Sequence, residues 1–105
     1  MSSKPFAAIA LVIDKFKVVI NKGSKNGIKE GDRFLIYELT KDIVDPETNI
    51  SLGPLEMSKG TGVAANVQET MTIVESDMFG GSEFGLDAPQ EPFENPKVND
   101  KAKPI

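Results

Sequence analysis

The sequence predicts an all-β protein: a small β-barrel or barrel-like sandwich of about six short strands, followed by a disordered C-terminal tail. Two observations lead to this fold class. Apolar and polar residues alternate over short stretches, which is the pattern of strands with one buried face. Glycine-containing turns separate these stretches at a spacing of roughly ten residues, which is typical of small barrels and sandwiches.

The first two strands are expected to form a hairpin. Residues 6–13 are nearly all apolar (FAAIALVI), as in a strand that is buried on both faces, although periodicity alone leaves a short helix open for this segment. A short turn is expected at residues 14–15. In the strand that follows, Phe16, Val18 and Ile20 fall on one face and should point into the core.

Three glycines recur at every fourth position of the next loop, at Gly23, Gly27 and Gly31. Glycine adopts positive φ without the steric cost that other residues incur. This spacing therefore predicts a chain that reverses several times without forming a helix. Ile28, the only large apolar residue of the loop, should fold back and cover one end of the core. The third strand is expected over residues 33–39, with Phe34 and Ile36 alternating onto its buried face.

A polar connection over residues 40–54 is expected after the third strand. Pro46 disfavours a helical conformation for the residue before it, so the sequence Asp-Pro-Glu-Thr at residues 45–48 predicts a β-turn. The apolar residues on the two sides of this turn can pair as a small hairpin. They are Ile43 and Val44 before the turn, and Ile50 and Leu52 after it.

The remaining strands are expected over residues 55–59, 63–67 and 71–74. The Gly-Thr-Gly sequence at residues 60–62 predicts a bulge or a sharp bend between the first two of them. Closing all these strands into a barrel would remove the exposed strand edges that otherwise invite aggregation.

The composition changes after residue 76, which divides the chain into a β-barrel-like domain (residues 1–76) and an acidic, proline-containing flexible tail (residues 77–105). The tail holds six acidic residues, three lysines and only scattered apolar residues. It is expected to bury too little surface to offset an ordering cost of about 1–2 kcal/mol per residue. Its phenylalanines, Phe79, Phe84 and Phe93, are spaced like the anchors of a linear motif, and predict a tail that binds a partner, or the barrel itself. A tail without a binding role is the alternative.

Composition also narrows the function. The chain has a formal net charge of −4 and contains no cysteine, histidine or tryptophan. An acidic chain lacks the basic face that nucleic-acid binding requires. Without histidine or cysteine, the commonest general base and the commonest transition-metal ligands are missing, and the serines have no histidine to activate them. We therefore expect no enzyme activity and no cofactor. No apolar run approaches the roughly 20 residues of a membrane-spanning helix.

The glycine loop provides the remaining candidate contacts, in which Lys25, Asn26 and Lys29 are expected to bind a partner protein. The backbone amides of the same loop could also bind a phosphate. However, the Gly-Lys-Ser/Thr ending of a P-loop is absent, and the loop is followed by a strand and not by a helix. The acidic residues of segment 42–47 could hold a calcium ion, but the twelve-residue pattern of an EF-hand is absent. For the glycine loop the simpler interpretation is a structural turn, and for segment 42–47 it is a solvated acidic turn.

Residues 18–34, VVINKGSKNGIKEGDRF, resemble a recurring bacterial strand–loop–strand pattern and are similar to part of the C-terminal domain of the flagellar assembly protein T family. Asp-Pro-Glu-Thr at residues 45–48, Leu52-Gly53 and residues 63–67 extend the resemblance, which covers roughly residues 16–75. A shorter form of the glycine loop resembles part of the β-barrel of the rod-shape protein MreC. The resemblance implies a β-barrel-like domain used for assembly or protein contact, with no catalytic residues to carry over.

These features predict a non-enzymatic protein-interaction or assembly module, a scaffold or structural component of a bacterial or phage assembly that binds another protein or associates with itself. The alternative is a domain that binds a small ligand or an anion through the glycine loop, residues 23–31. A complete chain of this sequence would be cytoplasmic. An excised domain of the flagellar type would be periplasmic.

Overall fold

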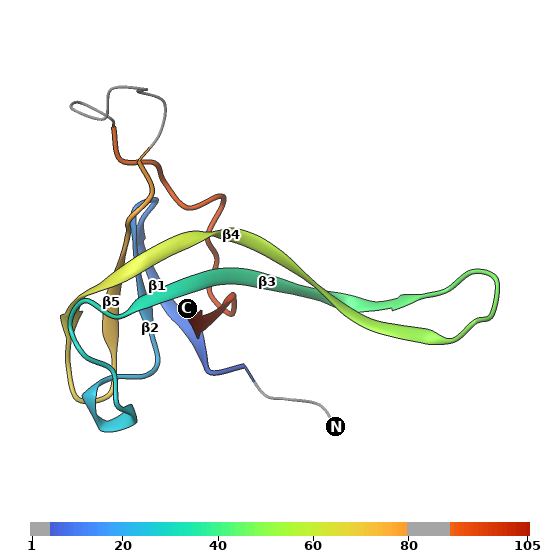
Figure 1. Ribbon diagram of the computed structural model, residues 1–105, viewed down its shortest axis with the longest axis horizontal. Helices are drawn as coiled ribbons and strands as arrows, with labels where there is room; N and C mark the ends of the chain where they lie inside the picture. Colours follow the sequence, from blue (N-terminus) through green and yellow to red (C-terminus); the bar gives the residue numbers. More distant parts are fainter. Residues whose placement is uncertain (1–4, 80–88) are drawn as a thin grey trace.

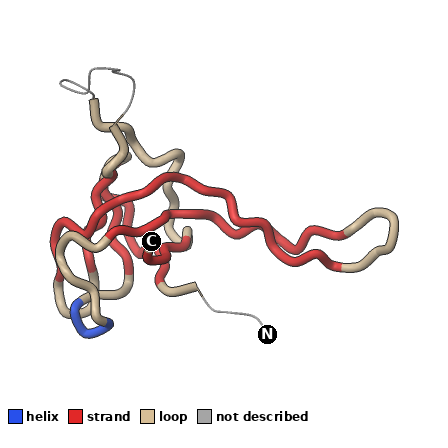
Figure 2. Tube along the Cα trace, in the orientation of Figure 1, coloured by secondary structure: helices blue, strands red, loops and turns tan. Residues whose placement is uncertain are grey.

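The computed structural model describes residues 5–79 and 89–105 and consists almost entirely of β-strands (Figure 1 and Figure 2). Six antiparallel strands form one sheet that closes on itself in the order β1-β2-β5-β4-β3-β6. This closed sheet confirms the prediction of a small, barrel-like all-β fold. The strands are β1 (Ala7–Asp14), β2 (Lys17–Ile20), β3 (Arg33–Val44), β4 (Ser51–Val67), β5 (Thr72–Ser76) and β6 (Lys101–Pro104).

The interior of the ring is filled by the residues whose alternation predicted the strands. Val18 and Ile20 of β2, and Phe34 and Ile36 of β3, are at most 1% exposed. Ile28 covers one end of the core as expected. Burying a side chain of this size contributes about 1.5–3 kcal/mol, so this small core carries most of the stability of the fold. The full cluster comprises Ala7, Ile9, Val18, Ile20, Ile28, Phe34, Ile36, Ala64, Val74, Phe93 and Ala102.

The glycine loop between β2 and β3 reverses as predicted and contains one short 3-10 turn, η1 (Ser24–Asn26). Gly27 ends this turn with a φ of 89°, a left-handed conformation that glycine adopts without strain. Gly23 is required for another reason, because a Cβ atom at this position would lie 2.1 Å from the carbonyl oxygen of Gln68. The glycines therefore let the loop pack directly against the backbone that follows β4.

Strands β3 and β4 are longer than expected and form one continuous hairpin. The sequence predicted three short strands separated by a polar connection, whereas β3 continues to Val44 and β4 runs unbroken from Ser51 to Val67. The bend predicted at residues 60–62 is present as an irregularity, since Ile36 pairs with Gly60 but the next residue pairs with Ser58. The inner half of this hairpin belongs to the ring, and the outer half extends beyond it (Figure 1).

The prediction of a separate, disordered tail after residue 76 is wrong for the described residues 89–105. Within this segment, β6 lies between β1 and β3, and Ala102 pairs with Ala7 on one side and with Ile36 on the other. The ring closes only through this strand. The segment is poor in apolar residues, but an existing sheet supplies the hydrogen-bonding partners and the buried surface that the isolated segment lacks.

Candidate functional site

The outer half of the β3–β4 hairpin projects from the ring, and we refer to residues 39–57 as the arm (Figure 1). Strand β6 pairs with β3 only over residues 34–37, and β5 pairs with β4 only over residues 62–67. Within the part of the chain that the structure describes, the two strands of the arm therefore pair only with each other. The arm is an extension that the ring does not need in order to close.

The turn at the tip of the arm lies where the sequence predicted it and is held by its own hydrogen bonds. The N–H of Asn49 donates to the carbonyl of Asp45 (2.8 Å), and the N–H of Asp45 donates to the carbonyl of Ile50 (3.0 Å). The Asp45 carboxylate also accepts a hydrogen bond from the N–H of Glu47 (2.9 Å). These bonds give the tip a defined shape.

Apolar side chains are concentrated on the arm. Of the twelve large apolar side chains that are exposed in the described residues, six belong to it, with exposed fractions of 44–66%. Scattered exposed apolar residues are normal on protein surfaces, but a contiguous group marks an interaction site. The six are Ile43, Val44, Ile50, Leu52, Leu55 and Met57.

The open strand edges of the arm are protected against pairing with further strands. The ladder between β3 and β4 is irregular between Leu39 and Asp42 and again at Val44. In the first of these places the hydroxyl of Thr40 accepts a hydrogen bond from the N–H of Leu55 (2.9 Å). Bulges and prolines, such as Pro54 opposite Asp42, are the means by which proteins prevent edge-to-edge association. The arm is therefore suited to recognition through its side chains.

The arm is also acidic. It contains four carboxylates, from Asp42, Asp45, Glu47 and Glu56, and one lysine, Lys41. Among these, Glu56 at the root forms an ion pair with Lys103 of β6 (2.7 Å). The other three carboxylates lie near the tip, next to the exposed apolar residues. A partner for this surface must offer an apolar hollow with positive charge around it.

A buried charged cluster holds the root of the arm against the C-terminal segment. The Nζ of Lys59 donates hydrogen bonds to the Asp100 carboxylate and to the carbonyl of Asn95 (both 2.8 Å), and lies 3.1 Å from a carboxylate oxygen of Glu38. Lys59 and Asp100 are 8% and 4% exposed. Burial opposes the charge of Lys59, but its bonds to Asp100 and Glu38 outweigh this effect and raise the pKa of Lys59. The lysine therefore remains charged at neutral pH.

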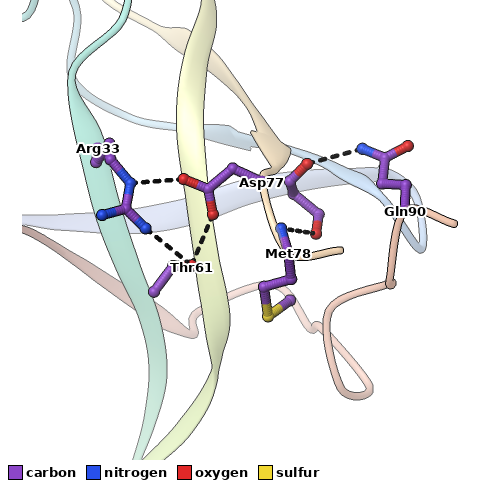
Figure 3. A network of polar contacts seen from close by, with 6 residues as sticks. Arg33, Thr61, Asp77, Met78 and Gln90 are labelled. Carbon is purple, nitrogen blue, oxygen red and sulfur yellow. Dashed lines mark hydrogen bonds and ion pairs between the residues drawn. The ribbon is translucent and has the colours of Figure 1, made fainter. Parts of the chain in front are cut away.

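A second polar network holds the segment that follows β5 (Figure 3). The Nε of Arg33 donates to one oxygen of the Asp77 carboxylate, and the hydroxyl of Thr61 donates to the other, both at 2.6 Å. On the far side of the same segment, the side-chain amide of Gln90 donates to the carbonyl of Ser76 (2.7 Å). The network ties β3, β4 and two C-terminal segments together, so its role is to maintain the ring.

This network makes stability depend on pH. Burial alone would raise the pKa of Asp77, but the hydrogen bonds from Arg33 and Thr61 outweigh it and lower this pKa. A depressed folded-state pKa stabilises the protein above the unfolded-state value, and the contribution is lost as the pH falls through the folded-state value. The melting temperature should therefore fall below about pH 4, the ordinary range of aspartate. The variant Asp77→Asn should show a shallower fall, and equal slopes would contradict this assignment.

The structure separates the six residues that the sequence predicted as partner contacts. Lys25 and Lys29 are exposed on the glycine loop, whereas the side chain of Asn26 is used internally, as the acceptor for the N–H of Gly23 (3.1 Å). Phe79 is 64% exposed. The remaining two are Phe84, which lies outside the described residues, and Phe93.

Phe93 was expected to bind a partner or the barrel itself, and the structure shows the second role, because its side chain is 2% exposed and belongs to the core of the ring. Sequence reasoning predicted a small hairpin around the turn at residues 45–48, but not that β3 and β4 continue through it as one projecting arm. Apolar residues flank the predicted turn at residues 45–48 on both sides, in a connection that is otherwise mostly polar. A turn between two apolar stretches indicates a hairpin. Strands β3 and β4 of this hairpin are longer than their neighbours β6 and β5 in the ring, so its outer half is left uncovered.

Comparisons with known proteins give no relative: no family model matches the chain and no curated protein matches it.

Over residues 5–79 and 89–105, no group of three or more acidic side chains is placed to hold a metal ion, and this includes the acidic segment 42–47. No helix in the described residues is long and apolar enough to cross a membrane. Fold and site define the chain as a small closed β domain with a projecting acidic and apolar arm.

Proposed function

We propose that this protein is a non-enzymatic assembly module that binds a protein partner through the arm. The observation that carries the proposal is the grouping of six exposed apolar side chains on a hairpin that the ring does not require. Leaving these side chains in water is unfavourable, by about 25 cal/mol per Å² of apolar surface. Covering them with a partner recovers this free energy. The resemblance to the flagellar assembly protein T family supports the same function, in a bacterial or phage assembly.

The hydrogen bonds of the glycine loop favour this function over anion binding. An anion cradle needs free N–H groups, but each N–H from Gly23 to Lys29 already donates within the protein. Two of them donate to the carbonyls of Gln68 and Glu69, and that of Lys29 donates to the Asp32 carboxylate. The loop is thus built to hold the chain in place, with the exposed side chains of Lys25 and Lys29 available for secondary contacts.

Removing the arm should leave the ring folded. Leu39 and Glu56 are directly paired across the hairpin, so a two-residue Asn-Gly turn can join them in place of residues 40–55. Because the arm contributes none of the core side chains, we expect the melting temperature to change by only a few degrees. Thermal unfolding followed by circular dichroism measures this. A large loss of stability would show that the arm is part of the folding unit.

Crosslinking in the source cell tests the function itself. A photoreactive amino acid at Leu52, on the arm, should give a crosslink to one discrete protein, which can be a second copy of this chain. The same group at Thr70, exposed between β4 and β5, is the matched control and should give none. If Leu52 and Thr70 give the same diffuse background, the proposed function is wrong.

A further inference from the structure

The ring carries a hollow that complements the arm in both charge and polarity. It has a volume of about 250 Å³ and lies beside the first residues of β1, where Phe6, Ala7 and Ala8 form its apolar wall. Its two charged lining residues are Lys22, which follows β2, and Lys101 of β6. No acidic side chain lines it in the described part of the chain. Asn21 is its other polar lining residue, and an apolar wall beside two lysines matches the requirement that the arm sets for its partner.

The tip of the arm offers the opposite chemistry. Ile50 and Leu52 are 63% and 66% exposed, and the carboxylates of Asp42 and Glu47 are close to them in sequence on the same hairpin end. An apolar side chain entering the hollow would bring these carboxylates toward the lysines. Opposite charges arranged in this way favour encounter and fix the register of a complex.

The arm cannot reach the hollow of its own molecule. The hollow lies on the ring, whereas the arm extends from the ring toward the far end of the molecule (Figure 1). The hairpin is stiffened by cross-strand pairing along its length. Contact between the two surfaces therefore requires two copies of the chain.

We propose that the arm of one copy docks into the Lys22–Lys101 hollow of a second copy, so that copies associate head to tail. This inference rests on the proposed function of the arm and adds the identity of the partner. The two surfaces differ, so the contact is heterologous. An open row of copies therefore keeps one unoccupied arm at one end and one unoccupied hollow at the other. Such contacts produce closed rings when the rotation between copies closes, and filaments when it does not.

Charge-reversal variants of the full chain test the contact. One variant reverses the arm (Asp42→Lys with Glu47→Lys), and the other reverses the hollow (Lys22→Glu with Lys101→Glu). Asp45 is left unchanged because it holds the turn. Each variant alone should have the sedimentation mass of a monomer, since its arm and hollow carry like charge. An equal mixture should associate again, because each arm then meets a hollow of opposite charge.

The wild-type protein provides the reference in sedimentation velocity. Its average mass should rise with concentration at about 0.1 M salt and fall at about 1 M salt, where the screening length shortens from about 10 Å to about 3 Å. The control variant Glu91→Lys with Glu94→Lys changes two exposed acidic residues away from both surfaces and should associate like the wild type. If the hollow-reversed variant does not fold, Lys22→Gln with Lys101→Gln replaces it and should lower the average mass.

A wild-type protein that is monomeric at all concentrations, or a mixture of reversed variants that stays monomeric, would overturn head-to-tail association. The proposed function would survive this result if Leu52 still crosslinks to a different protein in the cell. Arm-dependent flotation of the protein with vesicles of neutral and anionic lipid would instead identify a membrane surface as the partner. The acidic tip disfavours that outcome, because the cytoplasmic leaflet of membranes is itself negatively charged.

Discussion

Replacing Phe93 with alanine is expected to destabilise the protein by about 3–5 kcal/mol, the usual cost of removing a buried phenylalanine ring from a core. Phe93 is 2% exposed and packs in the same cluster as the residues of β1, β2 and β3. Its N–H also donates a hydrogen bond to the carbonyl of Lys15 (2.9 Å), which anchors the C-terminal segment to the β1–β2 turn. The alanine variant keeps this backbone bond, so the expected loss comes from the core volume that the ring of Phe93 fills.

For a domain of this size the expected loss corresponds to a fall in melting temperature of roughly 15–30 °C. Phe79→Ala is the matched control, since this phenylalanine belongs to the same C-terminal region but is 64% exposed. It should change stability by no more than about 0.5 kcal/mol. Urea unfolding of the two variants distinguishes the cases, and equal midpoints would contradict the placement of Phe93 in the core.

Replacing Lys59 with methionine is expected to cost about 3 kcal/mol, because it removes one partner of a buried ion pair and leaves the Asp100 carboxylate without its cation. Methionine keeps an apolar stem of similar length, so the loss reports on the charge and its hydrogen bonds. The cluster joins the root of the arm to the C-terminal segment. The variant should therefore unfold at a lower urea concentration than the wild type.

The double variant Lys59→Met with Asp100→Asn should recover much of this stability, since it removes the uncompensated charge. The amide oxygen introduced by Asp100→Asn can still accept the hydrogen bond that Asp100 takes from the N–H of Lys97 (2.8 Å). Lys103→Met is the matched control, because Lys103 pairs with Glu56 at the surface, where both side chains are more than one third exposed. Such a pair contributes about 0–1 kcal/mol. A similar loss for Lys59→Met and Lys103→Met would show that burial does not strengthen the Lys59 cluster.

The local pattern of the sequence was sufficient for most of the ring. Alternation identified Val18, Ile20, Phe34 and Ile36 as core residues, whereas Phe16, expected on the same face, is only partly buried and lies outside the core cluster. The glycine spacing placed the loop after β2. The turn at the tip of the arm was also predictable from Asp-Pro-Glu-Thr, because proline and aspartate restrict the chain over a few residues. In each case the signal and its structural effect are close to one another in the chain.

The arm was only partly predictable. The apolar residues around the turn indicated a hairpin, but sequence alone did not show that β3 and β4 would continue past the ring. Whether Ile43 or Leu52 is covered depends on how far β5 and β6 extend beside them. The pairing of β5 with β4 begins only at Gly62, and the pairing of β6 with β3 ends at Tyr37. The exposure of the arm, and with it the candidate site, follows from this difference in strand length.

Local sequence patterns decide which stretches form strands and where the chain turns, because steric limits on φ and the period of two in a strand act between near neighbours. Long-range packing, in contrast, places Phe93 in the core, closes the ring through β6 and secures both with the Lys59–Asp100 pair. Their stability comes from contacts with residues much earlier in the chain, such as Ala7 and Ile36 for Ala102. A segment with few apolar residues buries too little surface to fold alone, yet it folds when a nearly complete sheet offers it one open position.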